Sequence, residues 1–266
     1  MTFPTKKSLI GMVHVGALPG SPAAAIPVAD LARQAAAEAK ILADAGFDAI
    51  IIENMHDAPY VHGSHGPETV AAMTCVGLAV REAAPNLPLG IQILSGGNRE
   101  ALGVALAVGA TFIRCENFVF SHVADEGLLA QAEAGPLLRY RRSIGAQHVN
   151  VFCDIKKKHA SHAITADLSI ADCVEGAEFF GADGVIITGT ATGKPASLAD
   201  LAQARAATKL PLLVGSGVEP AQLAPLFQHA DALIVGSWIK AGGCWKNPVD
   251  PRRAAELVKE ANRVRT

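Results

Sequence analysis

The stretch PLLVGSGVEPAQLAPLFQHADALIVGS, residues 211–237, decides the fold class of this chain. It holds two short runs rich in Leu, Val and Ile, each followed by small residues, with a helical segment between them. A strand, a helix and a second strand in this order are typical of βα units in a parallel sheet. The same alternation runs back through the sequence to residue 8, and one last helical segment follows it.

The whole pattern predicts about eight βα units. Strands are predicted at 8–15, 47–53, 87–95, 110–116, 148–155, 183–189, 211–216 and 232–237. Helices are predicted at 29–45, 68–84, 99–108, 129–144, 168–180, 198–207, 220–229 and 251–264. The chain has 266 residues, close to the roughly 250 of one (β/α)8 barrel. We therefore expect a single α/β domain over residues 1–266, a (β/α)8 TIM barrel of the phosphate-binding type. A doubly wound sheet is the alternative, but it normally carries a G-x-G-x-x-G turn after the first strand.

Composition excludes several classes of function. The formal charge of -2 gives no broad cationic field, so we expect no nucleic-acid partner. The five cysteines are scattered and form no C-x-x-C pair, which favours a reducing compartment. No signal peptide and no apolar run of membrane-spanning length is recognised. These features predict a soluble, cytoplasmic protein without membrane insertion.

Polar side chains stand at the end of nearly every predicted strand, where the active site of a (β/α)8 barrel lies. The candidate catalytic residues are His14, Glu53, Arg114, Asp154 and Lys156. Four further polar residues at strand ends are candidates for substrate binding: Asn54, Asn117, His159 and Thr188. Glu53 and Asp154 would act as acid or base, Arg114 and Lys156 would stabilise negative charge, and His14 would orient substrate or carry a proton.

The two glycine-containing turns predict a phosphate site. VGSGV at 214–218 and IVGS at 234–237 follow the last two strands. Small residues there let backbone N–H groups approach an anion, and a following helix would add its positive end. The predicted contacts are Gly215, Ser216, Gly217, Gly236 and Ser237. Turn geometry without a ligand is the alternative interpretation of both motifs.

The fifth strand ends in CDIKKKHASH, and strand alternation would place Asp154 and Lys156 on one face. Lys156 or Lys158 would be a Schiff-base amine if burial lowered its pKa, and a solvated lysine cluster is the alternative. His14, Glu53, Asp154 and His159 are residue types that bind metals, yet their spacing assigns none of them, and no cofactor is identified.

Two loops also bear on function. The sixth loop, TGTATGKPAS from Thr188, predicts a flap with Lys194 at its tip. The fourth loop contains FVF at 118–120, and exposed apolar residues there would cover the pocket or meet a partner.

Several separated motifs together resemble the BtpA family, also called BtpA/SgcQ. They are GMVHVGALPGSP at 11–22, DAIIIEN at 48–54 with a following D-x-P, G-A-x-F-I-R at 109–114, D-x-x-x-K-H-A ending at Ala160, and the two glycine turns. The resemblance covers essentially the whole chain and implies a phosphate-binding barrel. It also implies a link to photosystem I biogenesis, although relatives occur beside sugar-utilisation genes. LSGGN at 94–98 and KKKH at 156–159 depart from the family pattern.

Three hypotheses follow. The first is an enzyme that acts on a small phosphorylated molecule, for example a sugar phosphate. The second is a photosystem assembly or other partner-binding factor, which predicts an exposed apolar patch and a vestigial pocket. The third is a metal-dependent hydrolase. A homo-oligomer is compatible with each of them.

Overall fold

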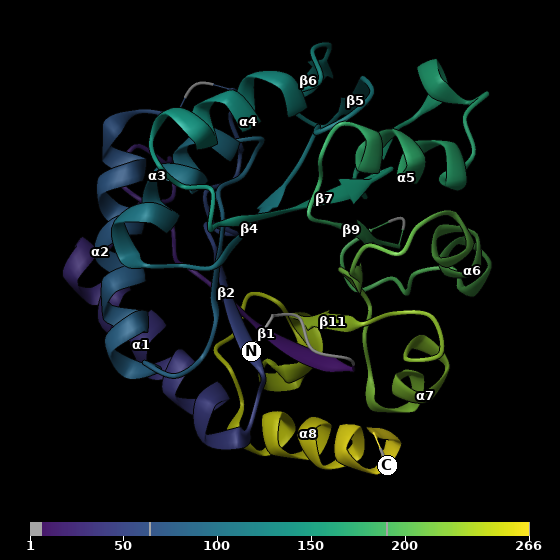
Figure 1. The fold of residues 1–266 in the computed structure, drawn as a ribbon. Helices are drawn as coiled ribbons and strands as arrows, with labels where there is room; N and C mark the ends of the chain where they lie inside the picture. Colours follow the sequence, from purple (N-terminus) through teal and green to yellow (C-terminus); the bar gives the residue numbers. More distant parts are fainter. Residues whose placement is uncertain (1–6, 64, 190, 266) are drawn as a thin grey trace.

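A closed barrel of parallel strands forms the centre of the molecule (Figure 1). The computed structural model describes residues 7–63, 65–189 and 191–265. Within them, eight strands close the barrel in the order β1-β2-β3-β4-β7-β9-β10-β11. The strands are β1 (Ser8–His14), β2 (Ala49–Glu53), β3 (Leu89–Gln92), β4 (Phe112–Cys115), β7 (Asn150–Ile155), β9 (Gly184–Ile187), β10 (Leu212–Val214) and β11 (Ala232–Val235). The predicted TIM barrel is confirmed, and the doubly wound sheet is excluded because β11 pairs with β1.

Helices surround the barrel, one after each strand (Figure 1). They are α1 (Val28–Ala45), α2 (Pro67–Ala83), α3 (Asn98–Val108), α4 (Ala134–Ser143), α5 (Ile170–Phe179), α6 (Leu198–Ala207), α7 (Leu223–Leu226) and α8 (Pro251–Arg265). Gly46 ends α1 with φ 92°, the left-handed conformation that glycine adopts without steric cost.

Two aromatic rings fill the barrel interior. Phe112 and Phe152 lie with ring centroids 5.4 Å apart among Ile, Leu, Met and Ala side chains from the other strands. A Cβ atom at Gly90 would lie 2.2 Å from the Phe112 ring, and one at Gly184 would lie 2.7 Å from the Phe152 ring. The two glycines therefore make room for the two rings, and the barrel below the mouth is a packed core.

A small antiparallel sheet joins two loops at the mouth. It consists of β6 (Gly127–Leu129), β5 (His122–Ala124) and β8 (Ala160–Ser161), in that order. The loop after β4 supplies β5 and β6, and the loop after β7 supplies β8. The predicted helix 129–144 is wrong at its start, because 127–129 pairs in this sheet and α4 begins only at Ala134. Phe118 of the same loop is buried in the core.

The segment after β10 is also less helical than predicted. Instead of one helix over 220–229, the structure has a 3-10 turn at Pro220–Gln222 and the four-residue α7. Among the described residues, none of the helices combines the length and apolar character needed to span a bilayer.

Candidate active site

Strand alternation brings the predicted residues together at the carboxyl end of the barrel. The interior core contains Met12, Ile51, Phe112 and Phe152. Two residues further along each strand, the side chain again points inward, because successive strand residues face opposite sides. Residues at these next inward positions are His14, Glu53, Gln92, Arg114, Asp154, Thr188, Gly215 and Gly236. The site is therefore the top layer of the barrel interior.

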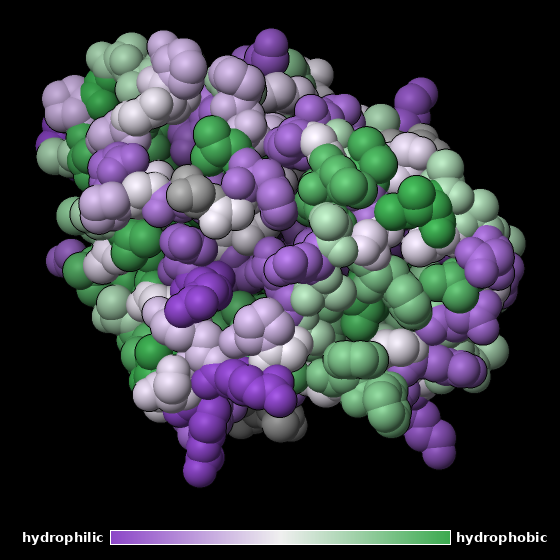
Figure 2. All heavy atoms as spheres, turned by 90° about the horizontal axis from the view of Figure 1, so that it is seen from above, coloured by the Kyte–Doolittle hydropathy of each residue, from purple (hydrophilic) through white to green (hydrophobic). Residues whose placement is uncertain are grey.

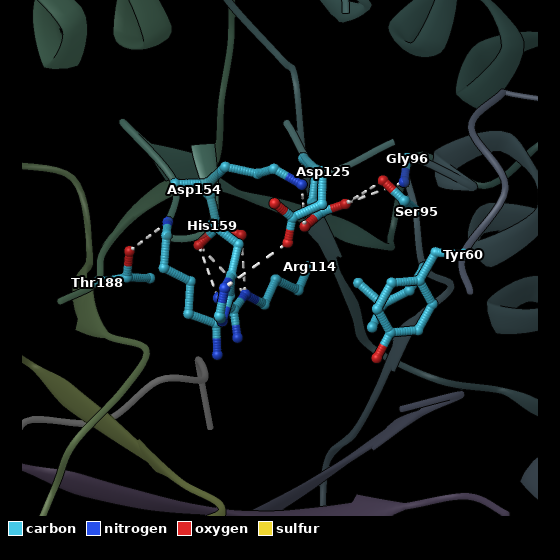
Figure 3. Close-up of polar contacts among 12 residues, drawn as sticks. Tyr60, Ser95, Gly96, Arg114, Asp125, Asp154, His159 and Thr188 are labelled. Atoms are coloured by element: carbon cyan, nitrogen blue, oxygen red, sulfur yellow. Dashed lines mark hydrogen bonds and ion pairs between the residues drawn. The ribbon is translucent and has the colours of Figure 1, made fainter. Parts of the chain in front are cut away.

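Arg114 and Asp154 form a buried ion pair (Figure 3). Nε of Arg114 lies 3.0 Å from Oδ2, and Nη2 lies 3.0 Å from Oδ1, so the contact is bidentate. Both side chains are almost fully buried, 4% and 1% exposed. This geometry leaves Asp154 committed to the guanidinium, and Arg114 is fixed as a cation in the centre of the mouth.

A second buried pair lies beside the first. Lys157 Nζ is 3.1 Å from Glu116 Oε1, and the backbone N–H of Gly96 donates to Oε2 at 3.0 Å. Burial alone would raise the pKa of Glu116, but the Lys157 ammonium and the Gly96 hydrogen bond hold that pKa below its usual value. Glu116 is thus held in its ionised form, and it links Lys157 to the backbone at Gly96.

Two charged groups of the mouth, Glu53 and Lys158, have no partner in the described part of the chain. Among the described residues, neither the Glu53 carboxylate nor the Lys158 ammonium takes part in a hydrogen bond or ion pair. Burial raises the pKa of Glu53, against the opposing effect of the Arg114 and Lys158 cations. Burial lowers the pKa of Lys158, and the Arg114 cation lowers it further. In both groups the shift favours the neutral form.

The glycine turns form an uncharged wall opposite these groups. Within the described residues, the backbone N–H groups of Gly217 and Ser237 donate no hydrogen bond. A Cβ atom at Gly215 would lie 3.1 Å from Arg114 Nη2, so this glycine lets the guanidinium approach the turn. The predicted helix dipole makes no contribution here, because the elements that follow the turns are only three or four residues long.

Ser216 has a different role from the predicted one for its side chain. Its Oγ accepts a hydrogen bond from Gly189 N at 2.7 Å and donates one to Lys194 O at 3.0 Å. The hydroxyl therefore holds the sixth loop against the β10 turn. Lys194 contributes its backbone at this contact, and Thr190 of the predicted flap lies outside the described residues.

His14 is held in one tautomer at the edge of the glycine turns. Its Nδ1 donates to Trp245 O at 2.9 Å, so Nε2 carries a lone pair. Burial, with the Lys240 cation adding to it, lowers the pKa of His14 to about 3. The imidazole is therefore neutral at pH 7 and can accept a hydrogen bond from a ligand hydroxyl.

Two adjoining cavities connect these groups. One of about 270 Å³ is lined by Glu53, Gln92, Asp154, Lys157 and Lys158. The other is narrower and lies between His14 and the glycine turns. Glu53, Arg114 and Lys158 line both, so the same charged groups border the larger cavity and the narrower one beside the glycine turns.

Lys156 does not lie where alternation predicts. β7 ends at Ile155, and Lys156 has a positive φ of 45°, which breaks the alternation. Its Nζ donates to Leu168 O at 2.5 Å, outside both cavities. The expectation that Asp154 and Lys156 share a face is wrong, and Lys158 occupies the place expected for Lys156.

The other predicted binding residues hold the loops. Asn117 donates to Gln131 O at 2.7 Å and lies outside both cavities. Asn54 donates to Leu94 O at 3.1 Å and accepts from Leu94 N. Thr188 Oγ1 accepts from Lys158 N at 3.0 Å.

His159 lines the larger cavity and accepts from Thr192 N at 3.1 Å, which ties the fifth loop to the sixth. In Figure 3 it lies beside Asp125, at an Nδ1–Oδ2 distance of 4.0 Å. Across the part of the chain that the structure describes, no group of three or more His, Cys, Asp or Glu residues is arranged to hold a metal ion.

Sequence reasoning missed two residues. Gln92 is buried, lines the larger cavity, and its Oε1 has no hydrogen-bond partner within the described residues. Arg253, in the first turn of α8, borders a third cavity with Gly217, Gly236 and Ser237. Alternation in β3 was a usable signal for Gln92, whereas Arg253 reaches the mouth from a helix and no strand pattern predicts it.

Comparison with known proteins identifies the family. A model of the BtpA family matches residues 5–263. This chain belongs to the BtpA family. A BtpA family relative, an uncharacterized mitochondrial protein of Caenorhabditis elegans, is 44% identical over 97% of this chain and 94% of its own length. The photosystem I biogenesis protein BtpA of Synechocystis sp. is 36% identical over 97% of this chain and 89% of its own length. The resemblance stated from the sequence is confirmed.

Solved structures show the same fold at low sequence identity. Thiamine phosphate pyrophosphorylase from Pyrococcus furiosus superposes on this BtpA family chain with a TM-score of 0.62 at 12% identity, over 99% of both chains. The (S)-3-O-geranylgeranylglyceryl phosphate synthase of Thermoplasma acidophilum, in complex with its substrate sn-glycerol-1-phosphate, gives 0.59 at 16% identity over 96% and 94%. Both likenesses concern the barrel alone.

Proposed function

We propose that this protein is an enzyme that acts on a small phosphorylated molecule, such as a sugar phosphate. The observation that carries the proposal is the pair of adjoining cavities at the mouth, where Arg114 lies between the N–H groups of the glycine turns and the unpaired Glu53. An anion beside the turns would meet backbone donors and a fixed guanidinium. The rest of the ligand would then face an acid/base group.

Each residue has a role in this proposal. The N–H groups of Gly217 and Ser237 bind the phosphate, and Arg253 adds a second cation from outside the turns. Glu53 transfers protons, and His14 Nε2 accepts a hydrogen bond from a hydroxyl. The Thermoplasma synthase, a barrel of this fold, binds a phosphorylated substrate, which supports the same class of ligand here.

Thermal unfolding with phosphate compounds tests the proposal. A ligand at 100 times its Kd stabilises the folded state by about 2.7 kcal/mol, so inorganic phosphate or a sugar phosphate should raise Tm. The change Gly217→Ala should abolish that rise, because a Cβ there would lie 2.3 Å from the Lys194 carbonyl carbon and φ is +64°.

Gly242→Ala is the matched control for that variant. Gly242 has nearly the same φ, +65°, but nothing lies within 4 Å of a Cβ built there. The quantity compared between the two variants is the rise in Tm that the ligand causes. A lower Tm of either variant without ligand therefore does not affect the result. A rise that persists in Gly217→Ala, or no rise with any phosphate compound, would contradict the proposal.

A partner-binding role is the second candidate, and one observation favours it. Phe179 and Phe180 at the end of α5 are 86% and 53% exposed, and Ile164 nearby in the chain is 55% exposed. Figure 2 shows hydrophobic residues gathered on the right of this face, the side on which α5 lies in Figure 1. The relative from Synechocystis carries the name of a photosystem I biogenesis protein. The assembly hypothesis also predicts a vestigial pocket, and the ordered mouth argues against that.

A further inference from the structure

The three consecutive lysines after β7 have three different environments. Lys156 Nζ donates to Leu168 O, and Lys157 Nζ is paired with Glu116. Among the described residues, Lys158 Nζ alone of the three has no hydrogen bond or ion pair. An ammonium in a partly buried site without a partner is unfavourable, so the position favours a neutral amine or a bound ligand.

The backbone of Lys158 is fixed although its amine is free. Its N–H donates to Thr188 Oγ1, and the neighbouring His159 contacts Thr192 of the sixth loop. The side chain then lines both cavities, as do Glu53 and Arg114. A phosphate at the glycine turns would therefore place the adjoining atoms of the same molecule next to the Lys158 amine.

We propose that Lys158 forms a Schiff base with the carbonyl carbon of a phosphorylated aldehyde or ketone, and that Glu53 exchanges the proton. This inference rests on the proposed function, because the phosphate site must hold the substrate for its carbonyl to reach Lys158. It narrows the substrate class from any phosphorylated molecule to one with a carbonyl group close to the phosphate.

Lys158 and Glu53 supply every group that the step needs besides the substrate. The neutral amine of Lys158 attacks the carbonyl carbon, and a proton passes from nitrogen to oxygen to give a carbinolamine. Glu53, in its acid form, then protonates the hydroxyl, the C–O bond breaks, and water leaves. The products are a protonated imine on Lys158, one water molecule and the Glu53 carboxylate, so no oxidant, reductant or metal is required.

Glu53 is the proton donor because it lines both cavities together with Lys158, whereas the unpaired Glu126 lines only the larger one and two further carboxylates are bound. Asp154 is bound by Arg114, and Glu116 is bound by Lys157. Burial raises the pKa of Glu53 and lowers the pKa of Lys158, so each shift favours the neutral form that the step uses.

Borohydride trapping tests the inference on the full chain. The protein is incubated with dihydroxyacetone phosphate or glyceraldehyde 3-phosphate, reduced with sodium borohydride, and analysed by intact and peptide mass spectrometry. One reduced adduct per chain is expected, on the peptide that contains Lys158. Lys158→Met should remove it, and Glu53→Gln should slow its formation by roughly 100-fold.

Lys156→Met is the matched control, since it removes an amine from the same run whose nitrogen lies outside the cavities. It should keep the adduct. An adduct that survives Lys158→Met, or no adduct from either probe, would overturn the inference. The rise in Tm with inorganic phosphate reports separately on the proposed function, so a rise without an adduct would overturn the Schiff base alone.

Discussion

On the β4–β7 side of the barrel mouth, buried charges meet in pairs, whereas the β10–β11 side presents backbone N–H groups and no ionised side chain of its own strands. Arg114 binds Asp154 and Lys157 binds Glu116 on the first side. Gly215, Gly217 and Gly236 form the second. Removing one partner of either buried pair should therefore cost stability, whereas the Gly217 and Ser237 N–H groups of the second side donate no hydrogen bond within the described residues.

Removal of one charge from the paired side should have the largest effect. Asp154→Leu leaves the Arg114 guanidinium buried without its partner, so we expect a loss of about 3–5 kcal/mol in the free energy of unfolding. Adding Arg114→Met to this variant should recover most of the loss, because the remaining charge is also removed. Denaturant unfolding of the parent, the single variant and the double variant measures the loss and its recovery. If Asp154→Leu were as stable as the parent, the pairing of buried charges would not distinguish the two sides.

The contribution of His14 to the stability of the folded state should depend on pH. Because the folded state holds the pKa of His14 near 3, below the usual 6.5, the unfolded chain binds a proton first as pH falls. The contribution of His14 to stability is therefore full above about pH 6.5 and is lost as pH falls from there toward about 3.

His14→Asn removes this titration. When the pH falls from 7 to about 4.5, the free energy of unfolding should decrease more in the parent than in the variant, by at most about 2–3 kcal/mol. Urea unfolding at the two pH values measures the difference. An equal loss in both proteins would show that His14 is not held neutral. Burial also lowers the pKa of His122, to about 4, and this group remains in both proteins, so it cancels in the comparison.

The smallest effect on folding is expected on the glycine side. Among the described residues, the Ser237 hydroxyl has no hydrogen bond, so Ser237→Ala should change the free energy of unfolding by about 0.5 kcal/mol or less. Ser237 lines the narrower cavity, so its hydroxyl would be a second donor to the phosphate beside its N–H. Its loss should cost about 1 kcal/mol, and phosphate affinity should fall several-fold. Titration calorimetry with phosphate and a denaturation curve separate the two effects. A large loss of stability with unchanged phosphate affinity would reverse the assignment of the two sides.

The sequence predicted the barrel because each strand carries its own signal. Runs such as 47–53 and 232–237 are apolar, short and followed by polar or small residues, and their inward positions continue directly into the site. His14, Glu53, Arg114 and Asp154 all reach the mouth by this rule. Periodicity in a strand thus predicts both the core and the layer above it.

The errors fall where the chain leaves regular structure. In KKKH, three identical residues give no pattern that distinguishes them, and only the positive φ of Lys156 decides that Lys158 faces the cavity. At 127–129 the strand is three residues long, too short for alternation to show, and the predicted helix 129–144 therefore begins within it. Both errors come from loop conformation, which local composition does not encode.

The fit between Gly90 and Phe112, and between Gly184 and Phe152, has an evolutionary consequence. Neither glycine can gain a side chain while the ring opposite it is in place, because a Cβ atom there would overlap that ring. Across the BtpA family, a larger residue at the position of Gly90 should therefore occur together with a smaller one at that of Phe112. At Gly184 the Pro211 carbonyl oxygen would also lie 2.9 Å from a Cβ atom, so this position should remain glycine. The packed interior would then vary by coupled exchanges, while the inward-facing residues that form the site keep their positions at the carboxyl end of the strands.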